Sequence, residues 1–188
     1  MTDKTDLGPL RQLASEAARR PVGAGRPPPR DLGEIGMRID RDGSWFYRES
    51  PITRSSLVKL FASVLRREAD GAYWLVTPAE RARVGVEDAP FLAVELDAAG
   101  TGQSQVLSFR TNLDEIVTAD GAHPLRVAVD PANAAPRPYI LVRDGLEARL
   151  TRPVFYQLVD LGREERVGAA VRFGVWSKHE FFPLGDLD

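Results

Sequence analysis

Two short amphipathic stripes, each preceded by a pair of alternating segments, constrain the fold of this chain more than any other feature. In residues 57–65 the apolar side chains recur at i, i+3, i+4, i+7 and i+8, which predicts a helix capped by Thr53 and ended by Asp70-Gly71. A similar stripe in residues 154–161 follows Thr151. Helices that interrupt hairpins, without the regular alternation of a doubly wound sheet, predict an α+β fold with mostly antiparallel, curved (roll-like) sheets.

Alternating apolar residues mark the strands that flank these helices. Residues 35–39 and 45–47 lie on either side of the turn at 40–43, which predicts a hairpin. Residues 139–142 and 146–150 form a corresponding pair around a second turn. Further strands are predicted at residues 72–76, 84–86, 91–96, 105–109, 125–129, 171–176 and 181–184.

The two helical segments begin alike. Ile52-Thr53-Arg54 precedes the first and Leu150-Thr151-Arg152 precedes the second, each after a hairpin and before an aromatic strand. This similarity predicts two tandem, structurally related hairpin-helix-strand units, at residues 31–118 and 119–188. The composition of residues 1–30 predicts an N-terminal arm, with one short helix from Pro9 to about Arg20 and a flexible stretch after it.

The chemical inventory of the 188 residues is limited. The absence of cysteine and the presence of only two histidines exclude a disulfide scaffold, a thiol nucleophile and a multi-histidine metal cage, but leave open a carboxylate-rich magnesium or calcium site. A net charge of -2 is too balanced for a general nucleic-acid or membrane-surface binder. The chain has no apolar run typical of a signal peptide or a membrane span, so we expect a cytoplasmic protein.

Arg54 and Arg152 are the most informative charged residues. Each lies in the first turn of a predicted helix, where the helix dipole disfavours a cation by up to about 1 kcal/mol. An internal carboxylate would reverse that effect, and Glu87, Asp88 and Glu147 are the candidates. A bound anion would also reverse it, and a solvated side chain is the third alternative.

The remaining candidates lie in connections or on hairpin strands. Glu87 and Asp88 either cap backbone groups and pair with arginines or hold a cation or the amine of a ligand. Asn112 and His123 lie on the predicted link between the units, where pockets are common. No catalytic residue and no metal ligand are assigned. The candidate ligand-binding residues are Arg54, Glu87, Asp88, Asn112, His123, Arg143, Glu147 and Arg152.

Several motifs in residues 34–185 resemble a family of bacterial proteins known as domain of unknown function 1285. They include Asp42-Gly43-Ser44-Trp45-Phe46-Tyr47, Pro51-Ile52-Thr53-Arg54, Val86-Glu87-Asp88-Ala89-Pro90-Phe91 and Val142-Arg143-Asp144-Gly145-Leu146. The resemblance implies a two-part α+β fold with internal structural similarity and a suggested role in ligand sensing or signalling. It implies no established activity and no catalytic residue.

Together these features favour a non-enzymatic cytoplasmic ligand-sensing or signalling/adaptor protein. We expect a charged cleft between the two units to accept a small anionic molecule or a peptide, while the residues identify no cofactor. One alternative is a small hydrolase or lyase that uses Glu87 or Asp88 with His123 as acid and base. The other is a protein-interaction module that uses the aromatic strands and the N-terminal arm.

Overall fold

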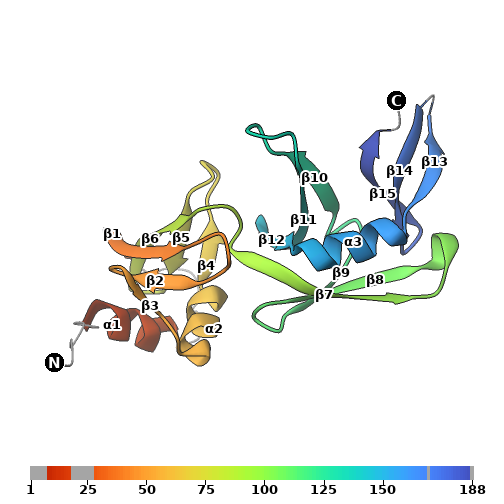
Figure 1. Ribbon diagram of the computed structural model, residues 1–188. Helices are drawn as coiled ribbons and strands as arrows, with labels where there is room; N and C mark the ends of the chain where they lie inside the picture. The colour runs from red at the N-terminus through yellow and green to blue at the C-terminus, as the bar shows by residue number, and fades with distance from the viewer. Residues whose placement is uncertain (1–7, 18–27, 169, 187–188) are drawn as a thin grey trace. The chain divides into compact units, whose positions relative to one another are not determined.

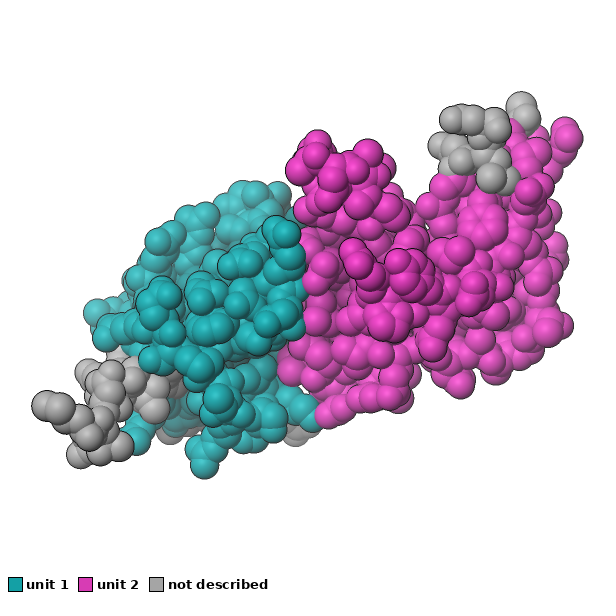
Figure 2. All heavy atoms as spheres, viewed as in Figure 1, with its two compact units in different colours: residues 1–87 teal, residues 88–188 magenta. Residues whose placement is uncertain are grey.

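The computed structural model describes residues 8–17, 28–168 and 170–186. The chain forms two compact units, residues 1–87 and 88–188 (Figure 2). The boundary predicted at 118/119 differs from this division and falls within the second unit. The strands between residues 91 and 118 belong there because they share one hydrogen-bonded sheet with later strands of the chain.

The described residues of the first unit form two helices and one six-stranded sheet of order β3-β2-β1-β6-β5-β4. Neighbouring strands are antiparallel except for β1 and β6, which are parallel. The elements are α1 (Gly8–Ala17), β1 (Arg30–Ile39), β2 (Trp45–Tyr47), β3 (Ser50–Pro51), α2 (Ser55–Ser63), β4 (Leu65–Arg67), β5 (Tyr73–Val76) and β6 (Glu80–Val86).

The hairpin predicted around residues 40–43 is confirmed. Ile39 of β1 pairs with Trp45 of β2, and both side chains are buried. The Trp45 ring stacks on Phe61 of α2, with 6.4 Å between the ring centroids. This packing places α2 against the apolar face of the sheet, and each fully buried apolar side chain contributes about 1.5–3 kcal/mol to the core.

The predicted limits of the first central helix need correction. Arg54, not Thr53, is the N-cap of α2, and no side chain caps that end. The helix ends at Ser63, and Leu65 begins β4, where it pairs with Leu75. The predicted helical stripe therefore divides between a helix and a strand, since cross-strand pairing to β5 outweighs helical periodicity at its end. Asp70-Gly71 lies in the turn between β4 and β5 rather than at a helix end.

The N-terminal helix is also found. It covers Gly8–Ala17, within one residue of the predicted start, and the predicted end near Arg20 lies outside the described residues. Leu13 is 1% exposed, and α1 packs beside α2 (Figure 1). Most of the flexible stretch predicted at residues 23–29 lies outside the described residues.

In the second unit, residues 88–168 and 170–186 form two sheets and one α-helix. The six-stranded sheet has the order β10-β11-β12-β7-β8-β9, in which only β12 and β7 are parallel. The other sheet, β13-β14-β15, is antiparallel. The elements are β7 (Phe91–Ala99), the short 3-10 helix η1 (Gly102–Ser104), β8 (Val106–Thr111), β9 (Ile116–Thr118), β10 (Leu125–Val129), β11 (Pro136–Arg143), β12 (Leu146–Leu150), α3 (Arg152–Asp160), β13 (Arg163–Val167), β14 (Ala170–Ser177) and β15 (Glu180–Asp186).

Helix α3 packs against β7 and β14, which belong to the two different sheets (Figure 1). Its buried side chains, Val154 and Leu158, are one helical turn apart and form a single apolar face. Pro153 lies in its first turn, where its missing N–H leaves no hydrogen bond unmade. The strand pairings of both units, together with their helices, confirm the expected α+β class with mainly antiparallel sheets.

Both units contain a hairpin, a helix and then a three-stranded antiparallel meander. In the first unit β6, the last strand of the meander, joins the sheet of the hairpin through β1. In the second unit the meander β13-β14-β15 forms a sheet of its own. Among the described residues, no helix has the length and apolar character needed to cross a membrane.

Candidate functional site

The two helix-start arginines lie at the expected places. Arg54 is the N-cap of α2, Arg152 is the first residue of α3, and both are exposed. Within residues 8–17, 28–168 and 170–186, neither has a carboxylate partner. The predicted internal ion pairs are therefore absent from the described structure.

The carboxylates expected to pair with these arginines instead pair with arginines of the sheets. Glu87 lies 3.8 Å from Arg38, and the Glu147 side chain accepts two hydrogen bonds from Arg126, of 2.5 and 2.6 Å. Asp88 forms an ion pair with Arg149 at 3.2 Å. Each of the three carboxylates therefore has an arginine of a sheet strand as its charged neighbour.

Arg54 and Arg11 of α1 line one groove of about 610 Å³ between α1 and α2. Arg11, like Arg54, has no ion pair with another residue that the structure describes. Apolar side chains and two hydroxyls complete the lining, which consists of Ala14, Ser15, Ser56, Leu57 and Leu60. The groove thus combines an apolar surface with two guanidinium groups that lack a counter-charge among the described residues.

A second charged cluster lies on β10, β11 and β12. Arg126, Tyr139 and Arg149 occupy directly paired positions on these three strands. The Tyr139 hydroxyl donates a 2.6 Å hydrogen bond to Asp88, whose side chain is only 8% exposed. Burial first, and then the Asp88 carboxylate, raises the pKa of Tyr139 to about 12. The other Asp88 oxygen, Oδ2, has a charged neighbour in Arg149 but no hydrogen bond within the described residues.

Two further predicted residues have structural contacts. The Asn112 side-chain oxygen accepts a hydrogen bond from the Leu92 backbone N–H, and the Asn112 backbone N–H donates to the Leu92 carbonyl. Asn112 therefore extends the hydrogen bonding of β7 and β8 by one residue beyond the pair Ala93–Thr111. Arg143 pairs with Glu115 and lies over the Phe91 ring, 5.1 Å from its centroid.

His123 belongs to a separate cluster. Its Nδ1 lies 3.0 Å from Asp120, and Lys178 lies 3.0 Å from the other oxygen of the same carboxylate. Lys178 first, and then His123, lowers the pKa of Asp120 to about 2. His123 has no hydrogen bond or ion pair to Glu87 or Asp88 in the described structure. The three residues of the acid-base alternative are thus not assembled into one site.

The groove was not predicted from the sequence, although one of its residues was. Arg54 was identified by its position at a helix start, whereas Arg11, Leu57 and Leu60 carried no signal beyond helical periodicity. Only the packing of α1 on α2 brings them together, and a long-range contact of this kind leaves no local pattern. No group of three or more His, Cys, Asp or Glu side chains suited to a metal ion occurs among the described residues.

Family models match nearly the whole chain. Residues 21–89 match the DUF1285 N-terminal domain, a domain of unknown function, and residues 90–184 match the DUF1285 C-terminal domain. The chain belongs to the DUF1285 family. The family resemblance predicted from the sequence is confirmed, and the limit between the matches lies close to the limit between the compact units. Helix α1 precedes both matched segments.

Two crystal structures of DUF1285 family proteins are similar to this chain. The one from Silicibacter pomeroyi DSS-3, at 2.50 Å resolution, is 44% identical and has a TM-score of 0.80, covering 93% of this chain and 94% of that one. The one from Shewanella baltica OS155, at 1.40 Å resolution, is 28% identical with a TM-score of 0.53, covering 68% of this chain and 92% of that one. No curated protein matches the sequence.

Proposed function

We propose that this DUF1285 protein is a non-enzymatic ligand-sensing protein of the cytoplasm, and that its ligand is a small amphipathic anion held in the groove between α1 and α2. The observation that carries the proposal is the position of Arg11 and Arg54. Both line the groove, and neither has a carboxylate partner among the described residues. A bound anion would supply the missing counter-charge.

The chemistry of the groove supports an anion with an apolar part. A guanidinium group binds a carboxylate or phosphate through two parallel hydrogen bonds, and the start of α2 adds a favourable dipole. Leu57, Leu60 and Ala14 offer an apolar surface to the rest of the ligand. The volume of about 610 Å³ lies in the range of small-molecule sites, which is about 300–1,000 Å³.

A binding role fits this groove better than catalysis. The described residues of its lining are arginines, serines and apolar residues, and none of them is a carboxylate or imidazole that could act as acid or base near neutral pH. An enzyme that uses His123 with Glu87 or Asp88 would need groups that lie in separate contacts here. A charged cleft between the two units remains a prediction.

The test uses decanoate, which joins a carboxylate to an apolar chain, with decanol and acetate as partial analogues. We expect decanoate to raise the melting temperature, because a ligand of the native state stabilises it by mass action. Arg11→Ala and Arg54→Ala should each abolish the shift. Arg152→Ala is the matched control, since Arg152 also starts a helix but does not line the groove.

Each other outcome of this experiment has a definite meaning. Equal shifts with decanol show apolar binding without recognition of charge and reject the proposal. The proposal is also rejected if decanoate shifts the Arg54→Ala and Arg152→Ala variants equally. A response to acidic peptides but not to decanoate favours the protein-interaction alternative. A wider thermal-shift screen of metabolites and nucleotides would then identify the natural anion.

We also infer that the hairpin, helix and meander of the two units form an internal repeat. The shared element order and the paired sequences Ile52-Thr53-Arg54 and Leu150-Thr151-Arg152 support this. Superposition of β1 to β6 on β11 to β15 in an experimental structure tests it. Failure of the helices and hairpins to overlay together rejects the repeat.

A further inference from the structure

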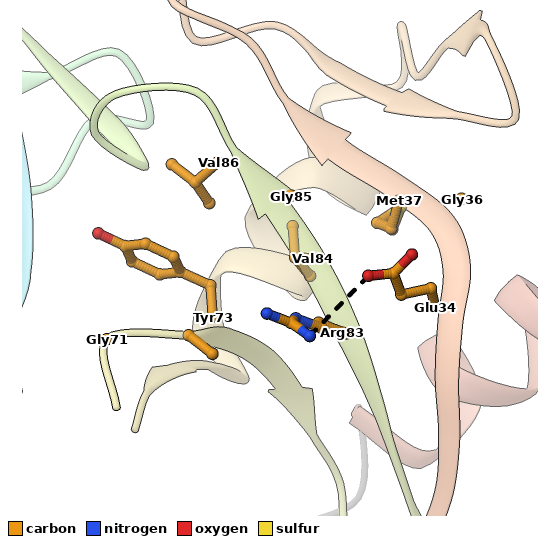
Figure 3. A pocket seen from close by; sticks show the side chains of 10 residues that line it. Glu34, Gly36, Met37, Gly71, Tyr73, Arg83, Val84, Gly85 and Val86 are labelled. Carbon is orange, nitrogen blue, oxygen red and sulfur yellow. Dashed lines mark ion pairs between the residues drawn. The ribbon is translucent and has the colours of Figure 1, made fainter. Parts of the chain in front are cut away.

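A cavity of about 400 Å³ lies in the first unit, where β1 departs from β6 (Figure 3). Glu34 pairs with Arg83, and the next pairing along the sheet joins Met37 to Val84. Three steps along β1 thus correspond to a single step along β6, and the extra residues bulge away from the neighbouring strand. The bulge opens the cavity.

Small residues keep the cavity open. Gly36, Gly71, Ala72 and Gly85 are among those that line it, so little side-chain volume enters from these positions. Gly36 and Gly71 have φ values of +80° and +84°, a region that L side chains rarely adopt. The conformation of the bulge and of the β4–β5 turn therefore favours glycine at these two positions.

One acidic and one basic side chain line the same cavity. Figure 3 shows Glu34 and Arg83 pointing toward each other, with 3.9 Å between Oε1 and Nη1. This separation is beyond hydrogen-bond distance, and both side chains are more than half exposed. Neither makes another hydrogen bond or ion pair in the part of the chain that the structure describes. A loose, exposed pair of this kind separates readily to accept a ligand with both charges.

Apolar groups line the rest of the cavity. Met37 and Val84 line it but are each only 3% exposed, so most of its accessible apolar side-chain surface comes from Tyr73 and Val86. Tyr73 also brings an aromatic ring to the lining, and the Arg67 guanidinium lies over this ring, 5.5 Å from its centroid. The lining therefore presents opposite charges next to an apolar and aromatic surface.

We propose that this cavity binds a small zwitterion that carries an apolar or aromatic group, as an α-amino acid does. The carboxylate of the ligand pairs with Arg83 and its ammonium group pairs with Glu34. Its side chain lies against Tyr73 and Val86. This site is separate from the groove between α1 and α2, since no described residue lines both.

The experiment titrates the full chain with L-phenylalanine by calorimetry and by backbone amide NMR. Phenethylamine lacks the carboxylate and 3-phenylpropanoate lacks the ammonium group, so each tests one charge. We expect L-phenylalanine to bind at least 10-fold more tightly than either analogue, with amide shifts at β1 and β6. Glu34→Gln and Arg83→Ala should each weaken binding at least 10-fold.

Two further variants control the experiment. Arg166→Ala removes an exposed cation of β13 and should leave the affinity unchanged. Ala72→Leu fills the cavity without touching either charge and should abolish binding while the amide spectrum stays folded. Arg54→Ala should retain L-phenylalanine binding, which separates this site from the groove. Equal affinity for 3-phenylpropanoate, unchanged binding by Glu34→Gln, or no binding of L-phenylalanine overturns the proposal.

Discussion

The hydroxyl of Tyr139 donates a hydrogen bond to the buried carboxylate of Asp88 at 2.6 Å. Tyr139→Phe removes the donor and leaves a buried acceptor unmatched, which should lower the free energy of unfolding by about 1–3 kcal/mol. The pKa of Tyr139 is raised to about 12 from an ordinary value of 10.0, so folding favours the protonated phenol. This contribution is complete below pH 10 and is lost as the pH rises toward 12.

Denaturant unfolding of both proteins between pH 8 and 12 measures this contribution. The stability difference between wild type and Tyr139→Phe should shrink across the upper part of the range. A difference that stays constant to pH 12 would show that the phenol does not titrate as the structure requires.

Asp120 should make stability depend on acid pH. Its pKa is lowered to about 2 from 3.8, because Lys178 and His123 contact the ionised carboxylate. The unfolded chain takes up the proton first, so the stabilisation is present above about pH 4 and disappears as the pH falls through 2. In urea unfolding, the free energy of unfolding should fall less between pH 6 and 2 for Asp120→Asn than for the wild type, with a difference of up to about 1 kcal/mol. Asp160→Asn, at an exposed position of α3, is the control and should follow the wild type.

Gly174 should tolerate no side chain. A Cβ at this position would lie 2.3 Å from the Phe182 carbonyl oxygen and 2.9 Å from Pro183 Cα, both backbone atoms of β15. Gly174→Ala must therefore push the strands apart, and we expect it to lower the free energy of unfolding by about 1–3 kcal/mol. Gly185→Ala is the matched control, since nothing lies within 4 Å of its Cβ. Equal melting temperatures for the two variants would contradict the packing described for β14 and β15.

Arg54 and Arg149 should differ sharply when truncated. Arg54→Ala removes no ion pair within the described structure, so stability should change by no more than about 0.5 kcal/mol. Arg149→Ala leaves Asp88, which is 8% exposed, without its charged neighbour and should cost about 1–3 kcal/mol. Chemical unfolding of both variants tests the contrast. A large loss with Arg54→Ala would reveal a stabilising partner and weaken the case for a ligand there.

Deletion of residues 1–27 should leave a folded but less stable first unit. Leu13 is 1% exposed, and its loss removes about 1.5–3 kcal/mol of apolar burial. The deletion also removes Gln12, which donates a 3.2 Å hydrogen bond to the largely buried Glu80. Cooperative unfolding at a lower midpoint is the expected result. Loss of cooperativity would show that α1 is indispensable to the core.

The sequence predicted the elements that carry a strong local pattern. The alternation of Ile35, Met37 and Ile39 identified β1, because one face of this strand packs in the core while the other faces solvent. The strand β13 was missed because Arg163–Val167 is charged and exposed along nearly all its length. Its strand conformation comes from pairing with β14, a partner that the local sequence does not specify.

The candidate site was likewise predictable only where the local sequence was sufficient. Arg54 was found by an electrostatic argument about one helix end, which requires no knowledge of the rest of the fold. Its expected carboxylate partners were wrong, because the choice among Glu87, Asp88 and Glu147 depends on which strands lie side by side. Glu34 and Arg83 were not singled out either, since a bulge in β1 brings them to one cavity.

The parallel pairing of β1 with β6 also governs how the first unit is made on the ribosome. The hairpins β1–β2 and β4–β5 join neighbouring segments and can form as soon as they emerge. Among the described residues, the two halves of the sheet share no strand pairing until β6 has been synthesised, because β6 alone pairs with both β1 and β5. Bringing β6 to β1 closes the long loop of chain between these two strands, and this closure is the slow entropic step of assembly. A nascent chain that stops before Glu80 therefore holds two separate hairpins, and chaperones that protect exposed apolar faces would meet it in that state.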